Sequence, residues 1–321
     1  MRLDGLVSTI IPVHNRPRLL REAVESVLAQ TYRPIEIVIV DDGSTDETPA
    51  AAARFAHDYP DIVRVARIAN GGPGVAREAG RQLARGEFVQ YLDSDDLLAP
   101  TKFEIQVAAL GASPESGAAY GRTRAYAIGQ RPLEKPWKRT GERIATMFPS
   151  FLASRWWDTS SPLYRRAVCD RAGPWTNLRC EEDWEYDCRV ASFGVRLAFC
   201  DAHVSDTRFH GGAMLSRPPD RRAALRDRAT ARAAIFAHAR AARLDEETLE
   251  MRAFARGLFL LARQCGAAGL ARESRALFDL SRDASGRRAG GWDFLAYRTL
   301  ASGLGWRLAG ALACRLDGLR A

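Results

Sequence analysis

Apolar residues form near-continuous runs along the first hundred residues, and stretches with helical spacing separate these runs. Uninterrupted apolar runs are typical of strands that are covered on both faces of a parallel sheet. We therefore predict strands over residues 6–13, 35–40, 62–68 and 87–92. Helices are predicted between them over residues 17–30, 46–59 and 73–86. This alternation of strands and helices predicts an α/β fold.

The pattern becomes less regular after this region. Residues 113–160 are rich in Gly, Pro and aromatic residues and show no clear period. A helical stretch follows over residues 181–194, and a strand-like run follows it over residues 195–200. From Pro218 onward the pattern is helical, with two helices predicted to meet at Gly266–Gly269.

The C-terminal region is basic and carries a broad apolar helix face. Leucine recurs every four residues from Leu300 to Leu316, an interval that drifts slowly around a helix. Residues 217–321 hold 20 Arg, no Lys and 11 acidic residues, while the whole chain has a net charge of +8. The first 216 residues are therefore close to neutral. We predict no nucleic-acid partner for this part of the chain.

Composition is typical of a soluble globular protein, with 46% hydrophobic and 27% charged residues among 321. No stretch reaches the roughly 18 consecutive apolar residues of a spanning helix. The N-terminus lacks the organisation of a signal peptide. The six cysteines form no CxxC pair and no zinc spacing, which predicts reduced thiols. We predict a cytoplasmic protein, with a peripheral position at the inner face of the cell membrane as an alternative.

Three aspartates within four positions, Asp93, Asp95 and Asp96, directly follow the fourth predicted strand. Carboxylates this close repel one another, and each resists ionisation beside the others. A helix N-cap is one explanation, because a helical pattern follows and Asp is a favoured cap. A divalent cation is the other explanation, because ligation would offset the repulsion. The aspartates alone leave both explanations open.

Polar clusters also follow the other predicted strands. His14-Asn15-Arg16 follows the first strand, Asp41-Asp42-Gly43-Ser44 the second, and "NGGPGVAREAG" the third. Ligands of open parallel sheets bind outside the carboxyl ends of the strands. Flexible glycine-rich backbone at a helix N-terminus suits a phosphate, although these glycines do not have the GxGxxG spacing of dinucleotide-binding folds. We therefore predict a shared ligand site at this edge of the sheet.

The segments "VSTIIPVHNR", "IEIVIVDDGSTDET", "NGGPGVAREAG" and "GEFVQYLDSDDLL" occur in this order. Together they resemble the nucleotide-sugar domain of inverting family-2 glycosyltransferases, whose fold is called GT-A. Three later segments, "SSPLYRRAVCDRAGPW", "EEDWEYDCRVASFG" and "RFHGGAMLS", resemble acceptor-side segments of that family. The resemblance implies a Rossmann-like, mostly parallel sheet flanked by helices. It also implies a catalytic domain over residues 1–216, with a nucleotide-sugar half over 1–112 and an acceptor half over 113–216. The resemblance does not cover residues 217–321, which composition and pattern predict to be a basic helical region.

The resemblance implies a site for the donor nucleotide. Pro12, His14 and Arg16 match the first nucleotide-contacting loop, in which the family often has Tyr where this chain has His14. Asp41 or Asp42 would accept a hydrogen bond from the imide N–H of a pyrimidine base.

The "DSD" segment looks like the family's DxD motif. Asp95 would coordinate Mg²⁺ or Mn²⁺ that bridges the donor diphosphate, and Asp93 with Ser94 would lie near the ribose and the metal. Arg77 corresponds to a basic position near the phosphates, with a helical surface arginine as the alternative. His210 could supply a further metal or phosphate contact, or be structural. The chemistry agrees, because Mg²⁺ binds through only one or two carboxylates plus substrate phosphates and stabilises a leaving diphosphate as a Lewis acid.

Inversion at the anomeric carbon requires a general base for the acceptor hydroxyl. The family's ED motif supplies this base, and in this chain it reads Glu182-Asp183. Asp183 is the predicted base, and Glu182 and Glu181 would orient it or contact the acceptor. The alternative explanation is a helix start, where acidic residues interact favourably with the helix macrodipole.

These assignments predict a glycosyltransferase that uses a UDP- or dTDP-linked sugar and a glycan, lipid-linked or small-molecule acceptor. A nucleotidyltransferase acting on sugar phosphates could also use paired aspartates and Mg²⁺, although "PVHNRPR" makes a poor triphosphate loop. A non-catalytic sugar-binding scaffold is a third hypothesis. For the C-terminal helices, the sequence leaves open a membrane contact, a homo-oligomer contact and packing on the catalytic domain.

Overall fold

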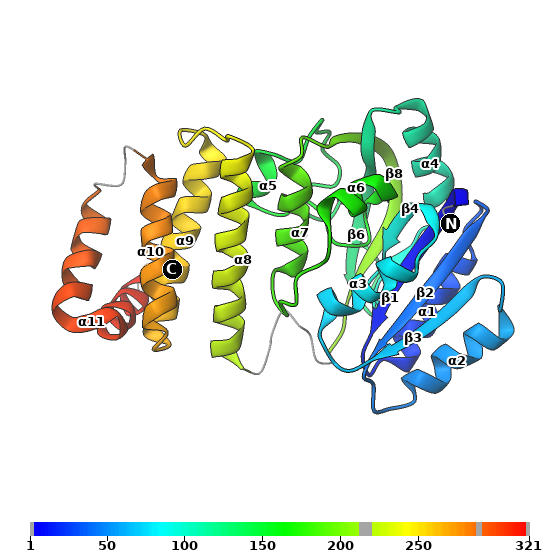
Figure 1. Ribbon diagram of the computed structural model, residues 1–321, viewed down its shortest axis with the longest axis horizontal. Coiled ribbons are helices and arrows are strands. Elements are labelled where there is room, and N and C mark those ends of the chain that lie inside the picture. Colours follow the sequence, from blue (N-terminus) through cyan, green and yellow to red (C-terminus); the bar gives the residue numbers. More distant parts are fainter. Residues whose placement is uncertain (1–2, 212–219, 287–290, 319–321) are drawn as a thin grey trace. The chain divides into compact units, whose positions relative to one another are not determined.

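The computed structural model describes residues 3–211, 220–286 and 291–318 of the chain (Figure 1). Strands and helices alternate along the first hundred residues, as the hydrophobic pattern predicts. The strands are β1 (Leu3–Val13), β2 (Ile35–Asp42), β3 (Val63–Ile68) and β4 (Gly86–Tyr91). The helices are α1 (Pro17–Leu28), α2 (Thr48–Asp58) and α3 (Pro73–Leu83). Each of these helices has proline in its first two positions, where the missing N–H costs no intrahelical hydrogen bond.

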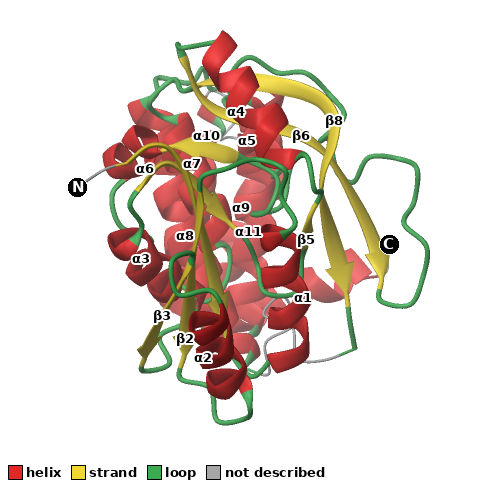
Figure 2. Cartoon of the chain, turned by 90° about the vertical axis from the view of Figure 1, so that its right-hand side faces the viewer, coloured by secondary structure: helices red, strands yellow, loops and turns green. Residues whose placement is uncertain are grey.

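The strands form one mixed eight-stranded sheet in the order β3-β2-β1-β4-β7-β6-β8-β5 (Figure 2). β1 pairs in parallel with β2 and β4, and β2 pairs in parallel with β3. The remaining strands are β5 (Leu97–Leu98), β6 (Ser116–Ala127), β7 (Leu163–Arg165) and β8 (Arg196–Phe209). β6 and β8 are parallel, whereas β7 and β5 run antiparallel to their neighbours. The predicted α/β fold is confirmed.

The core of the sheet lies between its strands and the flanking helices. All eight residues of β2 are buried, as its uninterrupted apolar run predicts. α1 buries Leu20, Ala23, Val24 and Val27, which recur with helical spacing on one face. α3 approaches the sheet closely at Gly80, where an added Cβ would lie 2.3 Å from Ile10 Cγ2.

Glu36 is one of the charged residues that are buried in this part of the structure. Glu36 of β2 is 1% exposed. Its carboxylate accepts hydrogen bonds from Ser8 Oγ (2.6 Å), Arg85 N (2.5 Å) and Arg85 Nε (2.9 Å). Burial raises the pKa of Glu36, but these hydrogen bonds and the Arg85 charge bring it below its ordinary value. Ionised Glu36 therefore contributes to the stability of the fold.

The helix-cap explanation of the aspartate cluster is wrong. The following helix, α4 (Lys102–Ala112), begins only at Lys102 and has Thr101 at its N-cap. Between the aspartates and this helix, Leu97–Leu98 form β5, which pairs with β8. The aspartates instead occupy a turn after β4, in which Asp96 N donates to Asp93 O (3.0 Å). The carboxylates are therefore held at the carboxyl end of β4.

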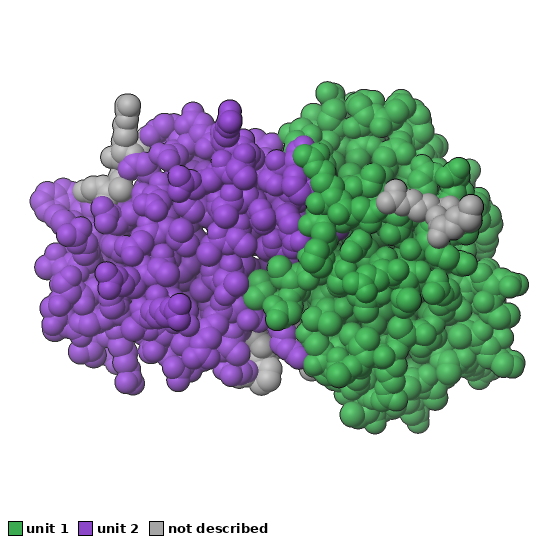
Figure 3. All heavy atoms as spheres, viewed as in Figure 1, with its two compact units in different colours: residues 1–147, 155–178, 194–212 green, residues 148–154, 179–193, 213–321 purple. Residues whose placement is uncertain are grey.

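The chain divides into two compact units (Figure 3). The sheet unit comprises residues 1–147, 155–178 and 194–212, and includes α6 (Arg166–Ala172). The helical unit comprises residues 148–154, 179–193 and 213–321. Besides the C-terminal helices it therefore contains α5 (Ser150–Ala153) and α7 (Glu182–Ala191). The predicted domain boundary between residues 216 and 217 lies outside the described residues and stays a prediction.

The C-terminal part of the helical unit consists of α8 (Arg221–Ala241), α9 (Leu249–Ala267), α10 (Ala271–Ala284) and α11 (Trp292–Gly318). The side chain of Asp220 accepts from the backbone N–H groups of Arg222 and Ala223, which caps α8. α9 and α10 meet where the sequence predicts, and Gly269 between them has a φ of +78° that favours glycine. None of the described helices is both long and apolar enough to cross a lipid bilayer.

Candidate active site

The loops that follow β1 and β2 are tied together at one edge of the sheet. Pro12 is buried in β1 and lies opposite Val40 of β2, so the two strands end side by side. His14 Nδ1 donates to Asp42 O (2.8 Å). Asn15 N donates to Ser44 Oγ (2.9 Å), and Asn15 Oδ1 accepts from the backbone N–H of Thr45 (2.8 Å). Two of the predicted polar clusters therefore share one edge.

The aspartates after β2 have different surroundings. The Asp42 carboxylate accepts from Gly71 N (2.7 Å) and Gly72 N (2.9 Å), and so holds the glycine-rich loop at the start of α3. Asp41 Oδ1 accepts from Ser44 N (2.9 Å). Asp41 Oδ2 is buried without a hydrogen bond from the described residues, although Arg67 Nε lies 3.2 Å away. Asp41 thus presents a buried acceptor oxygen, while Asp42 organises the neighbouring loop.

Asp95 contacts two of the other residues that were predicted to bind the donor. Arg16 Nη1, from the loop after β1, donates to Asp95 Oδ2 (2.7 Å). His210 Nε2, just after β8, lies 3.0 Å from the same oxygen. These three residues come from distant parts of the sequence, and the sheet brings them together.

Asp93 and Arg77 form a second pair beside this centre. Arg77 Nη2 donates to Asp93 Oδ1 (2.6 Å), and the guanidinium carbon lies 4.8 Å from the centre of the Trp175 ring. Arg77 is 3% exposed, so the alternative of a helical surface arginine is wrong. Ser94, between the two aspartates of the motif, is 4% exposed.

Asp96 and Arg208, which are not among the predicted site residues, also shape this turn. Asp96 accepts from Ser160 Oγ (3.0 Å) and from the backbone N–H of Arg208 (3.1 Å). Arg208 Nε in turn donates to the backbone carbonyl of Asp95 (2.6 Å). Burial raises the pKa of Asp96 well above its ordinary value, and the charges of Asp95 and Asp93 act in the same direction. In the sequence, the signal for Arg208 is its position two residues before His210 in the segment "RFHGGAMLS".

Asp95 and His210 are the residues that fit a divalent cation. Carboxylate oxygens suit Mg²⁺ and Mn²⁺, and histidine is the commonest metal ligand in proteins. Within the described ranges, no group of three or more His, Cys, Asp and Glu side chains could hold a metal. Mg²⁺ usually takes one or two carboxylates and completes its shell with water and substrate phosphates. The donor set therefore fits a cation that binds together with a diphosphate.

The predicted base lies in the helical unit, at the start of α7. Glu182 and Asp183 are the first two residues of this helix, and Glu181 is its N-cap. Asp183 Oδ1 accepts from the backbone N–H of Trp184 (2.7 Å), and Asp183 is half-buried. Glu182 is 6% exposed. The helix-start explanation is thus correct as a description of structure, and it does not exclude a role as base.

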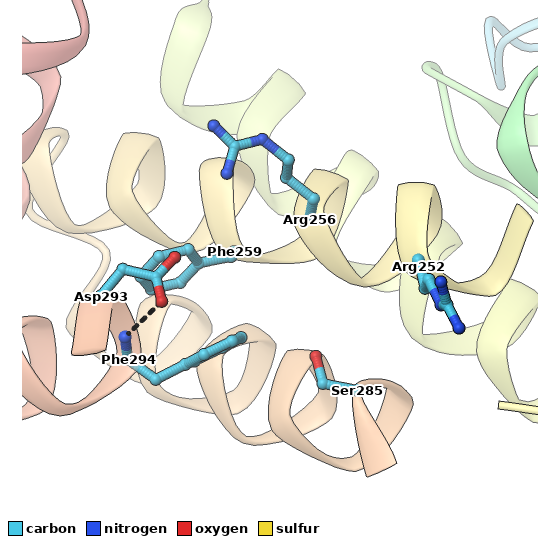
Figure 4. Close-up of a pocket in the computed structure, with 6 residues that line it drawn as sticks. All are labelled: Arg252, Arg256, Phe259, Ser285, Asp293 and Phe294. Atoms are coloured by element: carbon cyan, nitrogen blue, oxygen red, sulfur yellow. Dashed lines mark hydrogen bonds between the residues drawn. The ribbon is translucent and has the colours of Figure 1, made fainter. Parts of the chain in front are cut away.

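A small pocket in the helical unit is not the candidate site (Figure 4). Its volume is about 150 Å³, whereas small-molecule sites measure roughly 300–1,000 Å³. The pocket is lined by Arg252, Arg256, Phe259, Ser285, Asp293 and Phe294, and Asp293 Oδ1 accepts from Phe294 N (3.1 Å). None of the predicted site residues lines it.

Solved structures define the class of fold. S. aureus TarS 1–349, solved in complex with UDP-GlcNAc, matches with a TM-score of 0.70 and 18% identity over 99% of this chain and 92% of that one. The mannosyltransferase PcManGT from Pyrobaculum calidifontis, solved with GDP-Man and Mn²⁺, matches with a TM-score of 0.52 and 19% identity over 97% of this chain and 87% of that one. The fold is that of a GT-A glycosyltransferase, with a helical C-terminal region.

Sequence comparison gives the family. Residues 8–165 match the family model described as Glycosyl transferase family 2. The chain is 41% identical over 104 residues to the uncharacterized glycosyltransferase YibD of Escherichia coli K12, an alignment that covers 32% of this chain and 30% of that protein. It is 38% identical over 96 residues to the minor teichoic acid biosynthesis protein GgaA of Bacillus subtilis 168, covering 28% of this chain and 22% of that protein. The chain thus spans about a third or less of these relatives. The prediction of a family-2 glycosyltransferase is confirmed.

Proposed function

We propose that this protein is an inverting glycosyltransferase that moves a sugar from a nucleotide-diphosphate donor to a hydroxyl acceptor. The observation that carries this proposal is the convergence on Asp95, where Arg16 and His210 reach one carboxylate oxygen from distant parts of the chain. Carboxylate, imidazole and guanidinium groups together suit a diphosphate with its divalent cation. Family membership favours glycosyl transfer over nucleotidyl transfer and over a binding scaffold.

The donor phosphates would be bound at the DSD turn. Asp95 and His210 would hold Mg²⁺ or Mn²⁺, which stabilises the charge that develops on the leaving diphosphate when it is bound. Arg16 and Arg77 hold the carboxylates of Asp95 and Asp93 in place and supply positive charge beside the phosphates.

The nucleoside would be bound by the loops after β1 and β2. Asp41 or Asp42 accepts the imide N–H of the base, and the buried acceptor oxygen of Asp41 supports such a contact. Pro12 and His14 form the nucleotide-contacting loop, and Asp93 with Ser94 lies near the ribose. A uracil or thymine base is the proposed choice, and TarS, a structural neighbour, was solved with UDP-GlcNAc. A guanine nucleotide is the alternative, because PcManGT was solved with GDP-Man.

The chemical step is a single displacement. Asp183 takes the proton of the acceptor hydroxyl. The hydroxyl oxygen attacks the anomeric carbon from the face opposite the diphosphate. The bond from the anomeric carbon to the phosphate oxygen breaks, and its electron pair leaves with the diphosphate. Glu182 orients the base or contacts the acceptor. A glycan or lipid-linked acceptor is proposed, and the relative named for minor teichoic acid biosynthesis supports a polymer of this kind.

A screen of donors, followed by two isosteric variants, tests the proposal. UDP-GlcNAc, a dTDP-sugar and GDP-mannose are screened with Mn²⁺ by thermal stabilisation, since a bound donor stabilises the fold. Turnover is then measured as released nucleotide. Asp183→Asn should lower turnover by about 10²–10⁴-fold and leave the affinity for the nucleotide with Mn²⁺ unchanged. Asp95→Asn should weaken that affinity as well, and Asp61→Asn, at an exposed position, should change neither.

Three results would contradict the proposal. Near wild-type turnover of Asp183→Asn would place the base elsewhere. Turnover that is unaffected by EDTA would remove the metal assignment. A product that retains the anomeric configuration, read by NMR, would overturn the single displacement.

We also propose that α11, which is kinked at Gly305 (φ +79°, ψ +157°), lies on an anionic lipid surface. This helix packs on α9 and α10 through aromatic and small residues. Tyr297, Ala301, Ala309, Gly310 and Ala313 are buried, and the rings of Phe294, Tyr297 and Trp306 contact Phe259 or Phe278. An added Cβ on Gly310 would lie 2.5 Å from Ala267 N of α9. The leucines of α11 are exposed instead, at 40–56%: Leu295, Leu300, Leu304, Leu308, Leu312 and Leu316.

The charged residues of α11 favour a lipid surface over a second copy of the helix as the partner of its exposed leucines. Arg298, Arg307 and Arg315 are exposed among the leucines, and Trp292 is 87% exposed at the first position. A second copy of this helix would bring like charges together, whereas an anionic bilayer complements the arginines and takes up leucine and tryptophan. A peripheral position at a membrane therefore fits the helix better than self-association.

A further inference from the structure

The Glu182-Asp183 dipeptide is flanked by two residues that meet on one guanidinium group. Before it, the Glu181 carboxylate accepts from Arg232 Nε (2.7 Å) and Arg232 Nη2 (3.2 Å) of α8. After it, the Trp184 ring lies under the same guanidinium, with Arg232 Cζ 3.9 Å from the ring centre. A two-point ion pair and a cation–π contact are both directional, so one side chain fixes both ends of the dipeptide.

Trp184 carries this restraint to the carboxylate of Asp183. Its indole Nε1 donates to the carbonyl of Phe151 (2.7 Å), so the ring is held from two sides. Its backbone N–H donates to Asp183 Oδ1 (2.7 Å). The orientation of the Asp183 carboxylate is therefore linked through Trp184 to Arg232.

The backbone before Asp183 is held in a conformation that few residues adopt. Glu181 has a φ of +59° and a ψ of +16°, in the left-handed region that favours glycine. A non-glycine residue stays there only where its surroundings determine the conformation, and such residues cluster at functional sites. The ion pair with Arg232 is the shorter of two that hold the Glu181 side chain, since Arg228 Nε also lies 3.8 Å from Glu181 Oε1.

Further contacts from α8 support the same segment. Arg179 N donates to Asp227 Oδ2 (2.9 Å), two residues before Glu181. One turn into α7, Glu185 Oε1 lies 2.8 Å from His238 Nε2. Asp227, Arg232 and His238 therefore hold the start of α7 at three successive points along α8.

We propose that Arg232 is a positioning residue for glycosyl transfer, which acts by fixing Glu181 and Trp184 on both sides of Asp183. This inference rests on the proposed role of Asp183 as the base. A base must lie within hydrogen-bond reach of the proton that it takes, and a displacement of about 1 Å can cost roughly a hundredfold in rate. The donor-side residues belong to the sheet unit, so loss of Arg232 should affect the chemical step and not nucleotide binding.

Arg232→Ala provides the main test, with nucleotide release from UDP-GlcNAc, or the best donor of the panel, measured in Mn²⁺. We expect kcat to fall between about tenfold and a hundredfold, with the Kd for UDP and Mn²⁺ unchanged in calorimetry. Arg232→Lys keeps the charge but lacks the planar fork, so its kcat should be intermediate. Added guanidinium should partly restore kcat in Arg232→Ala. Arg222→Ala removes an exposed arginine from the same helix and should leave kcat unchanged.

A double variant tests the route through Glu181. If Arg232 acts by holding this side chain, Glu181→Gln should lower kcat too. Glu181→Gln combined with Arg232→Ala should then lose much less than the product of the two single effects. Fully multiplicative effects would show that Arg232 does not act through Glu181 and would overturn this route.

The failure of this inference can be told apart from failure of the proposed function. Wild-type kcat in Arg232→Ala beside a slow Asp183→Asn would overturn the inference alone. An active Asp183→Asn would overturn the proposed base, whatever Arg232 does. A parallel loss of kcat and nucleotide affinity would show a general structural role and also overturn the inference. If Arg232→Ala does not fold by circular dichroism, Arg232→Lys is tested in its place. A wild-type kcat in Arg232→Lys that does not change when Glu181→Gln is added would then overturn the inference.

Discussion

Replacing Gly80 with alanine should push α3 away from the sheet. The added Cβ would lie 2.3 Å from Ile10 Cγ2 and 3.2 Å from Val40 Cγ2. Carbon atoms pack at about 3.5–4.0 Å, so either the helix or Ile10 must move by about 1 Å. Ile10 is fully buried in the sheet, which leaves its side chain no open space. Movement of α3 is the expected response.

The magnitude follows from two opposing effects on the free energy of unfolding. Glycine to alanine inside a helix normally stabilises by about 1 kcal/mol, through helix propensity. Overpacking of a well-filled core typically costs about 1–3 kcal/mol. Gly111→Ala in α4 is a matched control, because its Cβ would meet nothing within 4 Å and only propensity would act. The two variants should therefore differ by about 1–3 kcal/mol, with Gly80→Ala the less stable.

Urea unfolding of the full chain, followed by far-UV circular dichroism, measures this difference. α3 also carries Arg77 one turn before Gly80, so Gly80→Ala should weaken binding of UDP with Mn²⁺, while Gly111→Ala should not. Equal stability of the two variants would refute the packing argument. A destabilised Gly80→Ala with normal nucleotide affinity would refute the link from α3 to the donor site.

Two further predictions concern the C-terminal helix and acid stability. The 321-residue chain should sediment with phosphatidylglycerol vesicles and not with phosphatidylcholine vesicles. Combining Leu304→Ser, Leu308→Ser and Leu312→Ser should abolish sedimentation with the vesicles. Leu249→Ser, at another exposed position, should not affect it. A dimer that the triple variant converts to a monomer, without vesicle binding, would identify a second copy as the occupant instead. The folded-state pKa of Glu36 lies below its ordinary value, so its stabilising effect is present above about pH 4.5 and is lost as the pH falls further. Glu36→Gln should therefore be less stable than wild type at neutral pH, and the gap in urea midpoints should close as the pH falls below 4.5. A gap that stays constant as the pH falls would contradict the assignment.

The sheet and its ligand edge could be predicted because each depends on local pattern. Strands that are buried on both faces have near-continuous apolar runs, and β2 and β4 have such runs, interrupted only by Glu36 in β2 and by Glu87 and Gln90 in β4. Since parallel strands end at one edge, polar residues that follow them must lie close together. This is why His14 and Asp42 could be placed at the same edge before any contact was known.

The remaining features depend on contacts between distant residues. The sequence predicts no strand at Arg208 and leaves the role of Asp96 open, and the pairing of β5 with β8 brings the two residues together. Glu181 and Arg232 belong to separate helices, and nothing in either local pattern indicates their ion pair. The helix N-cap, one of two explanations for the aspartate cluster, is wrong because the short β5, which carries no periodic signal, separates the aspartates from α4.

The make-up of the helical unit has a consequence for how such enzymes can be recombined. The family match ends at residue 165, before the Glu182-Asp183 dipeptide, and α8 begins after it at Arg221. A chimera that joins this chain's residues up to β8 to a relative's C-terminal helices would keep Asp183 but replace the helix that carries Arg232. Such hybrids should bind their nucleotide and turn over slowly. To transfer a new acceptor activity, a chimera would have to exchange the segment around α7 together with the helices that hold it.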